Sequence, residues 1–315
     1  MKKEKYILWV RLLTVVTLLA GVVSCSNEMT VGLESEGKPI VVVAEIGGQG
    51  SAGGITRTDA VSTENTYDRT EFVSTDVIRI TKTVSGKSES ADYVFNDSKW
   101  SAKSNALKLQ SGATYQAVYP VGYENGQIRQ DQTSAENYWL SNRLLSGVLT
   151  SPRTENLEFT VENNTAFKHQ NARLTVIFKP ERAVTTETVA TLVVSAAGLR
   201  TGNNDTQSIK PLYVNGLSTS GGSTTNATTD LTWCCIMYPK GGEAGNAGTG
   251  ETDITVRLTY EEVVYTVVLK SKMKAGTDYR YTLSLHNDIL IPEDITIKDW
   301  ENGGNKEGNL KDITT

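Results

Sequence analysis

The chain has 315 residues and a formal net charge of −5; 38% of its residues are hydrophobic and 21% are charged. This apolar content excludes a mostly disordered chain, and the mild acidity argues against nucleic acid as a partner. Two histidines leave little room for histidine-based catalysis or metal binding. At ~150 residues per domain, the length suggests about two domains of an exported binding or structural protein.

The N-terminus has the features of an export signal. Lys2, Lys3 and Lys5 form a positively charged start, and an apolar run follows over residues 12–23. This run is shorter than the ~20 apolar residues that a membrane-spanning helix needs. It is also the only long apolar run, so the sequence predicts a signal peptide over residues 1–24 and excludes a polytopic membrane protein.

The signal ends in Val22-Val23-Ser24-Cys25, which resembles the lipobox of bacterial lipoproteins. In that motif the cysteine thiol receives the lipid, and the small residue before it fits the signal peptidase, so we expect lipidation at Cys25. Ser26 follows the cysteine in place of Asp and gives no inner-membrane retention signal, which predicts the outer membrane. The alternative is an ordinary secretory signal in which Cys25 is incidental.

The rest of the chain shows short β signals and no helical periodicity. Runs of β-branched, aromatic and aliphatic residues are separated by clusters of Gly, Ser, Thr, Asn and Asp. Residues 279–285 are the clearest case, because Tyr and Leu alternate there with Arg, Thr and Ser. Many short strands between such turns predict an all-β chain of antiparallel β-sandwiches. The predicted strands are 40–46, 77–84, 93–96, 115–119, 157–161, 173–178, 191–196, 232–238, 253–259, 263–270, 279–285 and 294–299.

The strand signal is weakest in the middle of the chain at Glu162-Asn163-Asn164-Thr165. We therefore expect an N-terminal domain over residues 25–165 and a C-terminal domain over residues 166–315. A faint repeat supports two related halves, because Tyr119-Pro120 and Tyr238-Pro239 each end a predicted strand. Proline ends many strands, so this support is thin.

Apart from Cys25, the chain has two cysteines, Cys234 and Cys235. Their Cα atoms are ~3.8 Å apart across one peptide bond, below the usual disulfide range of ~4.4–6.8 Å. Both faces of the surrounding predicted strand are apolar. We therefore expect two buried thiols and no disulfide.

The candidate motifs for catalysis and cofactor binding lack the neighbouring residues that such sites require. Gly48-Gln49-Gly50-Ser51-Ala52-Gly53 fits the dinucleotide-binding pattern, but no helical pattern follows to hold a pyrophosphate. His169 and His286 have no nucleophile elbow near them, which favours structural roles. We therefore expect no enzyme, no cofactor and no metal site.

Several segments, in order along the chain, resemble the fimbrillin family, whose subunits build type V pili of Gram-negative anaerobes. The resemblance spans nearly the whole chain and implies two tandem transthyretin-like β-sandwich domains without catalysis or cofactor. It also implies other pilin subunits as partners. The matching segments are the lipobox at Cys25, the early strand with a following Thr56-Arg57, and residues 117–120, 167–176, 279–283 and 295–300.

The resemblance further implies maturation by strand exchange. Residues 40–44 of the early strand (Pro39–Ile46) are all apolar, which predicts that both faces of this stretch are covered. Removing it would leave an apolar groove that a strand of another subunit fills. The candidate exchanged strand consists of Ile40, Val41, Val42, Val43 and Ala44.

An arginine-specific protease would have to cut after this strand. Arg57 follows a glycine-rich stretch and is the predicted processing site, with Arg69 as the fallback. The alternative is that Arg57 is an ordinary loop arginine. The tail 301–315 is polar and lacks the alternation of a donor strand. Either the strand ending at Trp300 donates, or the protein is a tip or accessory subunit.

The predicted function is therefore that of a structural subunit of a surface-exposed pilus at the outer membrane, which contributes to adhesion by binding a surface receptor. The alternative is a monomeric surface lipoprotein that binds glycans. Aromatic side chains such as Trp100, Trp139 and Trp300 are available for stacking on sugars.

Overall fold

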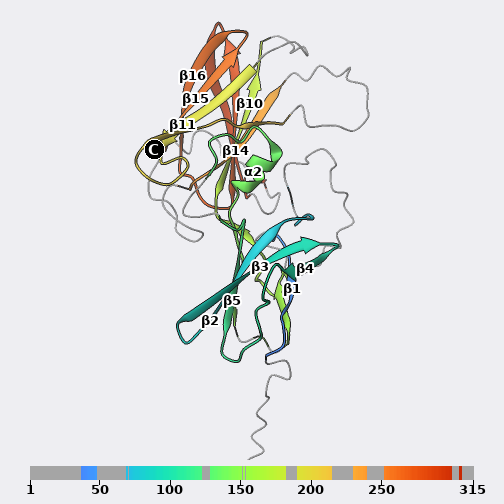
Figure 1. The fold of residues 1–315 in the computed structure, drawn as a ribbon. Helices are drawn as coiled ribbons and strands as arrows, with labels where there is room; N and C mark the ends of the chain where they lie inside the picture. The colour runs from blue at the N-terminus through green and yellow to red at the C-terminus, as the bar shows by residue number, and fades with distance from the viewer. Residues whose placement is uncertain are drawn as a thin grey trace, which may run out of the picture.

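Short β-strands form nearly all of the regular structure of the chain (Figure 1). The computed structural model describes residues 37–47, 69, 71–122, 128–150, 152, 154–181, 190–214, 230–239, 252–299 and 305–306. Most strand pairs are antiparallel and the described helix is short, so the predicted all-β class is confirmed. Among the described residues, no helix is long and apolar enough to cross a membrane.

The first half of the chain forms a seven-stranded sheet and a separate two-stranded parallel sheet, which we call the N-terminal lobe. The larger sheet has the order β4-β3-β2-β5-β6-β9, with β7 also paired to β5. The smaller sheet pairs β1 with β8. The strands are β1 (Val41–Ala44), β2 (Val77–Val84), β3 (Lys87–Asn96), β4 (Lys99–Ala102), β5 (Thr114–Tyr119), β6 (Leu144–Leu145), β7 (Leu149–Thr150), β8 (Asn156–Phe159) and β9 (Lys168–His169).

The second half of the chain forms a six-stranded and a four-stranded sheet, which we call the C-terminal lobe. Their orders are β13-β14-β10-β17-β18-β19 and β12-β11-β15-β16. One apolar core draws its side chains from both sheets. The strands are β10 (Ala172–Lys179), β11 (Ala190–Ala197), β12 (Thr206–Ile209), β13 (Leu212–Tyr213), β14 (Leu231–Met237), β15 (Thr252–Tyr260), β16 (Val263–Ser271), β17 (Thr277–His286), β18 (Ile289–Asp299) and β19 (Asn305–Lys306).

Side-chain alternation decides which face of each sheet meets the core. In β15, Ile254, Val256 and Leu258 are fully buried, whereas their neighbours Asp253 and Arg257 are exposed. This is the period of two that a half-buried strand requires. Every strand predicted from this pattern has a counterpart in the structure.

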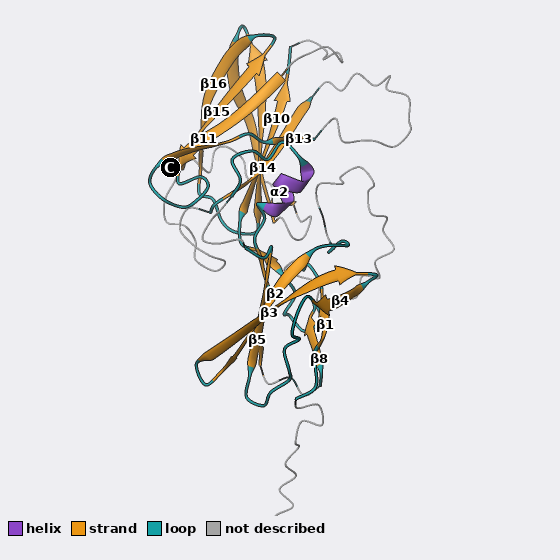
Figure 2. Cartoon of the chain, in the orientation of Figure 1, coloured by secondary structure: helices purple, strands orange, loops and turns teal. Residues whose placement is uncertain are grey.

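The elements that were not predicted are short. They are the two- to four-residue strands β4, β6, β7, β9, β12, β13 and β19 and the six-residue helix α2 (Ala135–Leu140). The helix begins after Ser134, whose hydroxyl accepts a hydrogen bond from the Asn137 backbone N–H at 3.1 Å. Figure 2 shows α2 where the two lobes meet.

The two adjacent cysteines lie on β14 and are confirmed as buried thiols. Cys234 and Cys235 are each 1% exposed, and no disulfide joins them. Burial raises the pKa of the Cys235 thiol far above its usual value, so the thiol stays protonated. Because neighbouring strand residues point to opposite faces, their burial shows that β14 is covered on both sides.

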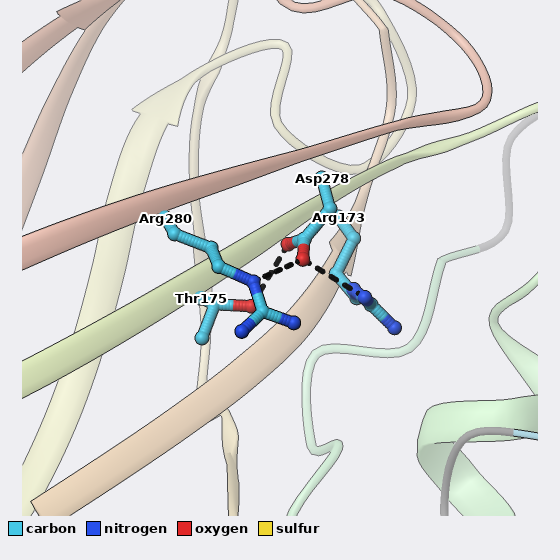
Figure 3. A network of polar contacts seen from close by, with 4 residues as sticks. All are labelled: Arg173, Thr175, Asp278 and Arg280. Carbon is cyan, nitrogen blue, oxygen red and sulfur yellow. Dashed lines mark hydrogen bonds and ion pairs between the residues drawn. The ribbon is translucent and has the colours of Figure 1, made fainter. Parts of the chain in front are cut away.

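A buried charge network joins β10 to β17 at the end of the C-terminal lobe (Figure 3). The Asp278 carboxylate is 1% exposed and accepts hydrogen bonds from Arg173 at 2.8 Å, Thr175 at 2.8 Å and Arg280 at 2.7 Å. Burial alone would raise the pKa of Asp278, but the two guanidinium groups outweigh it and hold that pKa below its ordinary value. The carboxylate is therefore charged and fully hydrogen-bonded.

We expect Asp278→Asn to reduce the free energy of unfolding of the C-terminal lobe by roughly 3–5 kcal/mol, because it leaves the buried Arg173 guanidinium without a counter-charge. The folded pKa lies below the unfolded one, so this contribution is complete above the unfolded value and is lost as pH falls towards the folded value. Urea unfolding between about pH 5 and pH 2 should show a steep loss in the natural chain and a shallower one in the variant.

Asp294→Asn is the matched control, because Asp294 lies exposed on the neighbouring strand β18. Equal stability and equal pH dependence of the two variants would contradict the assigned role of the network.

Candidate functional site

The segment 37–47, which contains β1, is hydrogen-bonded on one edge through residues 37–40 and on the other edge through residues 41–47. On one edge, the Ile40 backbone N–H donates to the Leu107 carbonyl at 3.1 Å, and the Leu109 N–H donates to the Lys38 carbonyl at 3.0 Å. On the other edge, β1 runs parallel to β8 in the register Val41 to Asn156. The segment therefore closes a gap between two parts of the N-terminal lobe.

The bonds on the β8 edge continue past the end of β1. The Glu45 N–H donates to the Phe159 carbonyl at 2.9 Å. The Gly47 N–H donates to the Phe167 carbonyl, and the Phe167 N–H donates to the Glu45 carbonyl, each at 2.9 Å. The Glu45 carboxylate also accepts from the Val161 N–H at 2.9 Å. Because an unpaired buried backbone group is costly, loss of the segment would create a demand for a replacement strand.

The side chains of the exchanged-strand candidate alternate between the core and solvent. Ile40 and Val42 are each 6% exposed, whereas Val41 and Val43 are 53% and 42% exposed. The prediction that this strand is covered on both faces is therefore wrong. A run of apolar residues predicts a fully buried strand only if a second layer covers its outer face, and here the outer face meets solvent.

The buried face of the segment still contributes substantially to the N-terminal core. Ile40, Val42 and Ile46 pack in the same apolar cluster as Leu157 and Phe159 of β8. At ~1.5–3 kcal/mol for each large side chain, burial of the three is worth roughly 5–9 kcal/mol. Removing the segment would expose an apolar groove bordered by backbone groups without partners.

The two predicted covalent sites, Cys25 and Arg57, lie outside the described residues, as does the glycine-rich stretch 48–53. Arg69 is described, and it is held in place. Its guanidinium pairs with Asp76 at 3.2 Å and lies 5.2 Å from the centre of the Trp139 ring. The structure thus places the fallback processing site against the folded lobe.

The histidines occupy different environments. His169 is buried, and its Nδ1 lies 3.0 Å from Oδ1 of Asn142. His286 ends β17 with its side chain 60% exposed, and its Nε2 lies 3.7 Å from Glu293. Neither has a nucleophile beside it among these contacts. No group of three or more His, Cys, Asp or Glu residues that could hold a metal ion occurs in the described part of the chain.

The lobes are joined through the segment between β5 and β6. Within α2, Tyr138 packs into the core of the C-terminal lobe, whereas the next residue, Trp139, packs into the core of the N-terminal lobe. Ile128 also belongs to the C-terminal core. A loop of the first half of the chain is therefore built into the second half.

Gln132 is the most constrained polar residue of this junction. It is fully buried, and its side-chain amide donates to the Ile236 carbonyl at 2.9 Å and accepts from the Ile236 N–H at 2.8 Å. Its backbone N–H donates to the Lys210 carbonyl at 2.9 Å. The side chain thus replaces a strand partner for β14 beyond the end of β13.

The chain crosses between the lobes through buried polar residues. Phe167 lies in the N-terminal core and Ala172 in the C-terminal core. Between them, Oδ1 of Asn171 accepts from the Arg143 N–H at 2.6 Å, and its carbonyl accepts from the Gly276 N–H at 2.9 Å. The run of four polar residues between Phe167 and Ala172 was the available signal for the junction, but the partners of these residues are distant in sequence.

Comparison with known proteins matches the sequence to a family. The sequence model of the fimbrillin-like family matches residues 56–300. A search of curated proteins found no match. A solved structure from Bacteroides ovatus ATCC 8483, classed provisionally as a cell adhesion protein, superposes with a TM-score of 0.54 at 14% identity and covers 84% of this chain and 98% of its own.

Two further solved structures give lower TM-scores. A fimbrial protein from Bacteroides ovatus ATCC 8483 scores 0.45 at 14% identity, with 78% of this chain and 48% of that chain covered. The fimbrial anchor protein Mfa2 from Porphyromonas gingivalis scores 0.37 at 11% identity, with 86% and 99% covered. The TM-score of the first structure supports a shared fold, and at 14% identity the likeness supports nothing beyond the fold.

We expect Gln132→Ala to destabilise the junction by about 2 kcal/mol or more, because two buried backbone groups of Ile236 lose their partners. The measurement is urea unfolding monitored by one probe in each lobe. If Gln132 couples the lobes, unfolding of the variant should separate into two transitions, one for each lobe. Gln130→Ala is the control, since Gln130 is exposed and bonds Ser208 across the same junction. Equal effects of the two substitutions would show that Gln132 does not hold the lobes together.

Proposed function

The chain belongs to the fimbrillin-like family, and on that premise we propose that it is a structural subunit of a cell-surface fimbria that joins its partners by β-strand exchange. We place it at the tip or in an accessory position, with a contribution to adhesion and no enzymatic activity. We further propose that the lobes correspond to two transthyretin-like β-sandwich domains. The chain passes between the lobes from Phe167 to Ala172, a few residues after the predicted division at residues 165 and 166.

The arrangement of segment 37–47 is the observation that carries this proposal. The segment is bonded on both edges, contributes three buried side chains, and precedes Arg57 in the sequence. Cleavage after Arg57 would cut its covalent link to the rest of the lobe. An extended strand of another subunit can then occupy the same backbone positions, as in donor-strand complementation.

The covalent tether explains why an uncut precursor should remain monomeric. A tethered strand has a high effective concentration, so a free competitor rarely displaces it. After cleavage the segment can dissociate, and its return becomes a bimolecular event. Proteolysis thus acts as the proposed trigger for assembly.

The position in the fibre follows from the strands available for donation. β18 is paired with β17 over its whole length within its own sheet. Donating it would break that sheet, which makes a donor role costly. This supports a tip or accessory position, where a subunit accepts a strand and need not provide one.

Anchoring is proposed through Cys25. A lipid on this thiol would hold the precursor at the outer membrane and expose the lobes at the cell surface. The proposed partners are then other pilin subunits and a host or bacterial surface receptor.

The glycan-binding lipoprotein has less support. Trp139 is 1% exposed and its ring is covered by Arg69, so it offers no stacking face. Trp100 is partly buried and packs edge-on against Phe72, with ring centres 5.1 Å apart. Trp300 lies outside the described residues.

We expect the precursor to be a monomer that does not bind partner subunits, and the protein nicked after Arg57 to bind them. Arg57→Ala should fold normally and fail to assemble. Native gels and light scattering of precursor, nicked protein and variant, each with purified partner subunits, provide the measurement. Nicked protein that stays folded yet never binds a partner would show that strand exchange is the wrong mechanism.

A pair of valine substitutions separates strand docking from general damage. Val42→Asp places a charge on the buried face and should loosen the segment, whereas Val43→Asp changes the exposed face and should behave like the natural chain. Partner binding by the uncut Val42→Asp precursor, without binding by Val43→Asp, is the expected result. Equal behaviour would contradict the assigned orientation.

Cys25→Ala should abolish acylation and release the protein from the outer membrane, because the thiol is the proposed lipid acceptor. Labelled palmitate incorporation and membrane fractionation measure this directly. Ser26→Ala serves as the control and should keep both properties. Equal labelling of Cys25→Ala and the natural chain would contradict lipidation at this residue.

A further inference from the structure

Arg69 is the first described residue after Gly47, and its side chain has two specific contacts. The guanidinium lies over the Trp139 ring at 5.2 Å, and its Nη1 donates to Oδ1 of Asp76 at 3.2 Å. The side chain is 26% exposed. Moving the Arg69 side chain away from the lobe would break both its cation–π contact and its ion pair. We call Arg69, Asp76 and Trp139 the Arg69 clasp.

The Asp76 carboxylate is itself fixed and cannot follow Arg69 outward. Asp76 is 7% exposed; its Oδ1 accepts from the Tyr119 hydroxyl at 3.1 Å and its Oδ2 from the Val73 N–H at 2.8 Å. Burial, and then the adjacent Asp76 charge, raise the pKa of the Tyr119 hydroxyl far above its usual value. The hydroxyl therefore stays protonated and continues to donate.

The backbone just after Arg69 is held as well. Phe72 is 6% exposed, and its ring packs edge-on against Trp100 and Phe167, each at 5.1 Å, and against Tyr119 at 5.7 Å. The turn that follows is pinned to β3, because the Thr75 N–H donates to the Phe95 carbonyl at 2.8 Å. Arg69 and residues 71–76 are thus fixed against the lobe.

A protease that cuts after arginine must bind the arginine side chain and several residues around it in an extended form. A cavity of about 580 Å³ beside the clasp, lined in part by Ser74, Lys103 and Glu136, exposes the site to solvent. Cleavage nevertheless requires the guanidinium to leave Trp139 and Asp76 and the Phe72 ring to leave the core. When reclosing is fast, the cleavage rate follows the population of this open form.

We propose that the Arg69 clasp protects the peptide bond after Arg69 from arginine-specific proteolysis in the folded protein and marks the end of the exchangeable segment. Processing is thereby restricted to positions before residue 69, such as Arg57. The consequence for strand exchange rests on the function proposed above, whereas the protection is a property of the precursor alone. Residues from Arg69 onward stay with the lobe after β1 has left.

Limited digestion of the folded precursor with an arginine-specific protease tests this, with new N-termini followed over time by mass spectrometry. Cleavage after Arg57 in the same molecule is the internal reference. Asp76→Asn should raise the rate after Arg69, relative to Arg57, about tenfold or more, the factor that corresponds to 1.4 kcal/mol of opening free energy. Glu136→Gln is the control. Glu136 lines the same cavity and makes no described interaction with Arg69, so this variant should leave the ratio unchanged.

A second variant keeps the test decisive if Asp76→Asn does not fold, which thermal melting would show. Trp139→Phe keeps an aromatic ring but weakens the stacking, and should raise the ratio a few-fold, since Trp is the better partner for a cation. Equal cleavage after Arg69 and Arg57 in the natural chain would overturn the proposal. An unchanged ratio in every folded variant of the pair Asp76→Asn and Trp139→Phe would also overturn it. No partner subunit is present, so neither result depends on whether assembly occurs by strand exchange.

Discussion

The hydrogen bonds that segment 37–47 makes on its two edges are the constraint on which the proposed function of this protein depends. A strand at the margin of a β-protein usually has one bonded edge, and the open edge is managed by charge, shortness or cover. Here the segment connects the stretch around Leu107 to β8, so its departure would open two edges at once. The lobe would then be one strand short, which is the state that a subunit built for donor-strand complementation must reach.

The junction between the lobes has the opposite character. Gln132, Tyr138 and Asn171 are buried and bonded or packed across it, so the second lobe has a fixed attachment that strand exchange need not disturb. The Asp278 network lies beside this crossing, because Arg173 follows Ala172 on β10 and the Gly276 N–H, just before β17, donates to the Asn171 carbonyl. A subunit that bears load in a fibre benefits from such an arrangement, because one segment can be exchanged while the rest of the molecule keeps its shape.

The sequence predicted the parts of the fold that follow a local pattern. Alternation in strands such as β2 and β17 reports burial directly. The adjacent Cys234 and Cys235 were expected inside because both faces of their strand are apolar, and both are buried. The failures arise where tertiary context decides. The apolar stretch Val41–Ala44 predicts a fully buried strand, but none of the described elements covers its outer face, where Val41 and Val43 are exposed. The helix α2 is too short to show a helical period.

The candidate site was only partly predictable for a related reason. The candidate exchanged strand was predicted from the family resemblance and its apolar content, whereas the contacts of Arg69 with Asp76 and Trp139 depend on residues up to 70 positions away in the chain. Gln132 carries no local signal, because its partner Ile236 is more than a hundred residues distant. Pairings of this kind are properties of the folded chain and not of any segment.

The most direct measurement is hydrogen exchange of a chain that begins at Thr58, with and without a synthetic peptide of residues 37–47. Without the peptide, the amides of Leu109, Val161 and Phe167 should exchange rapidly, because Lys38 and Glu45, which accept their hydrogen bonds, are missing. With the peptide, their protection should return to the level seen in the precursor. Full protection of these amides in the shortened chain alone would contradict the account, because the segment would then not be the strand that completes the lobe.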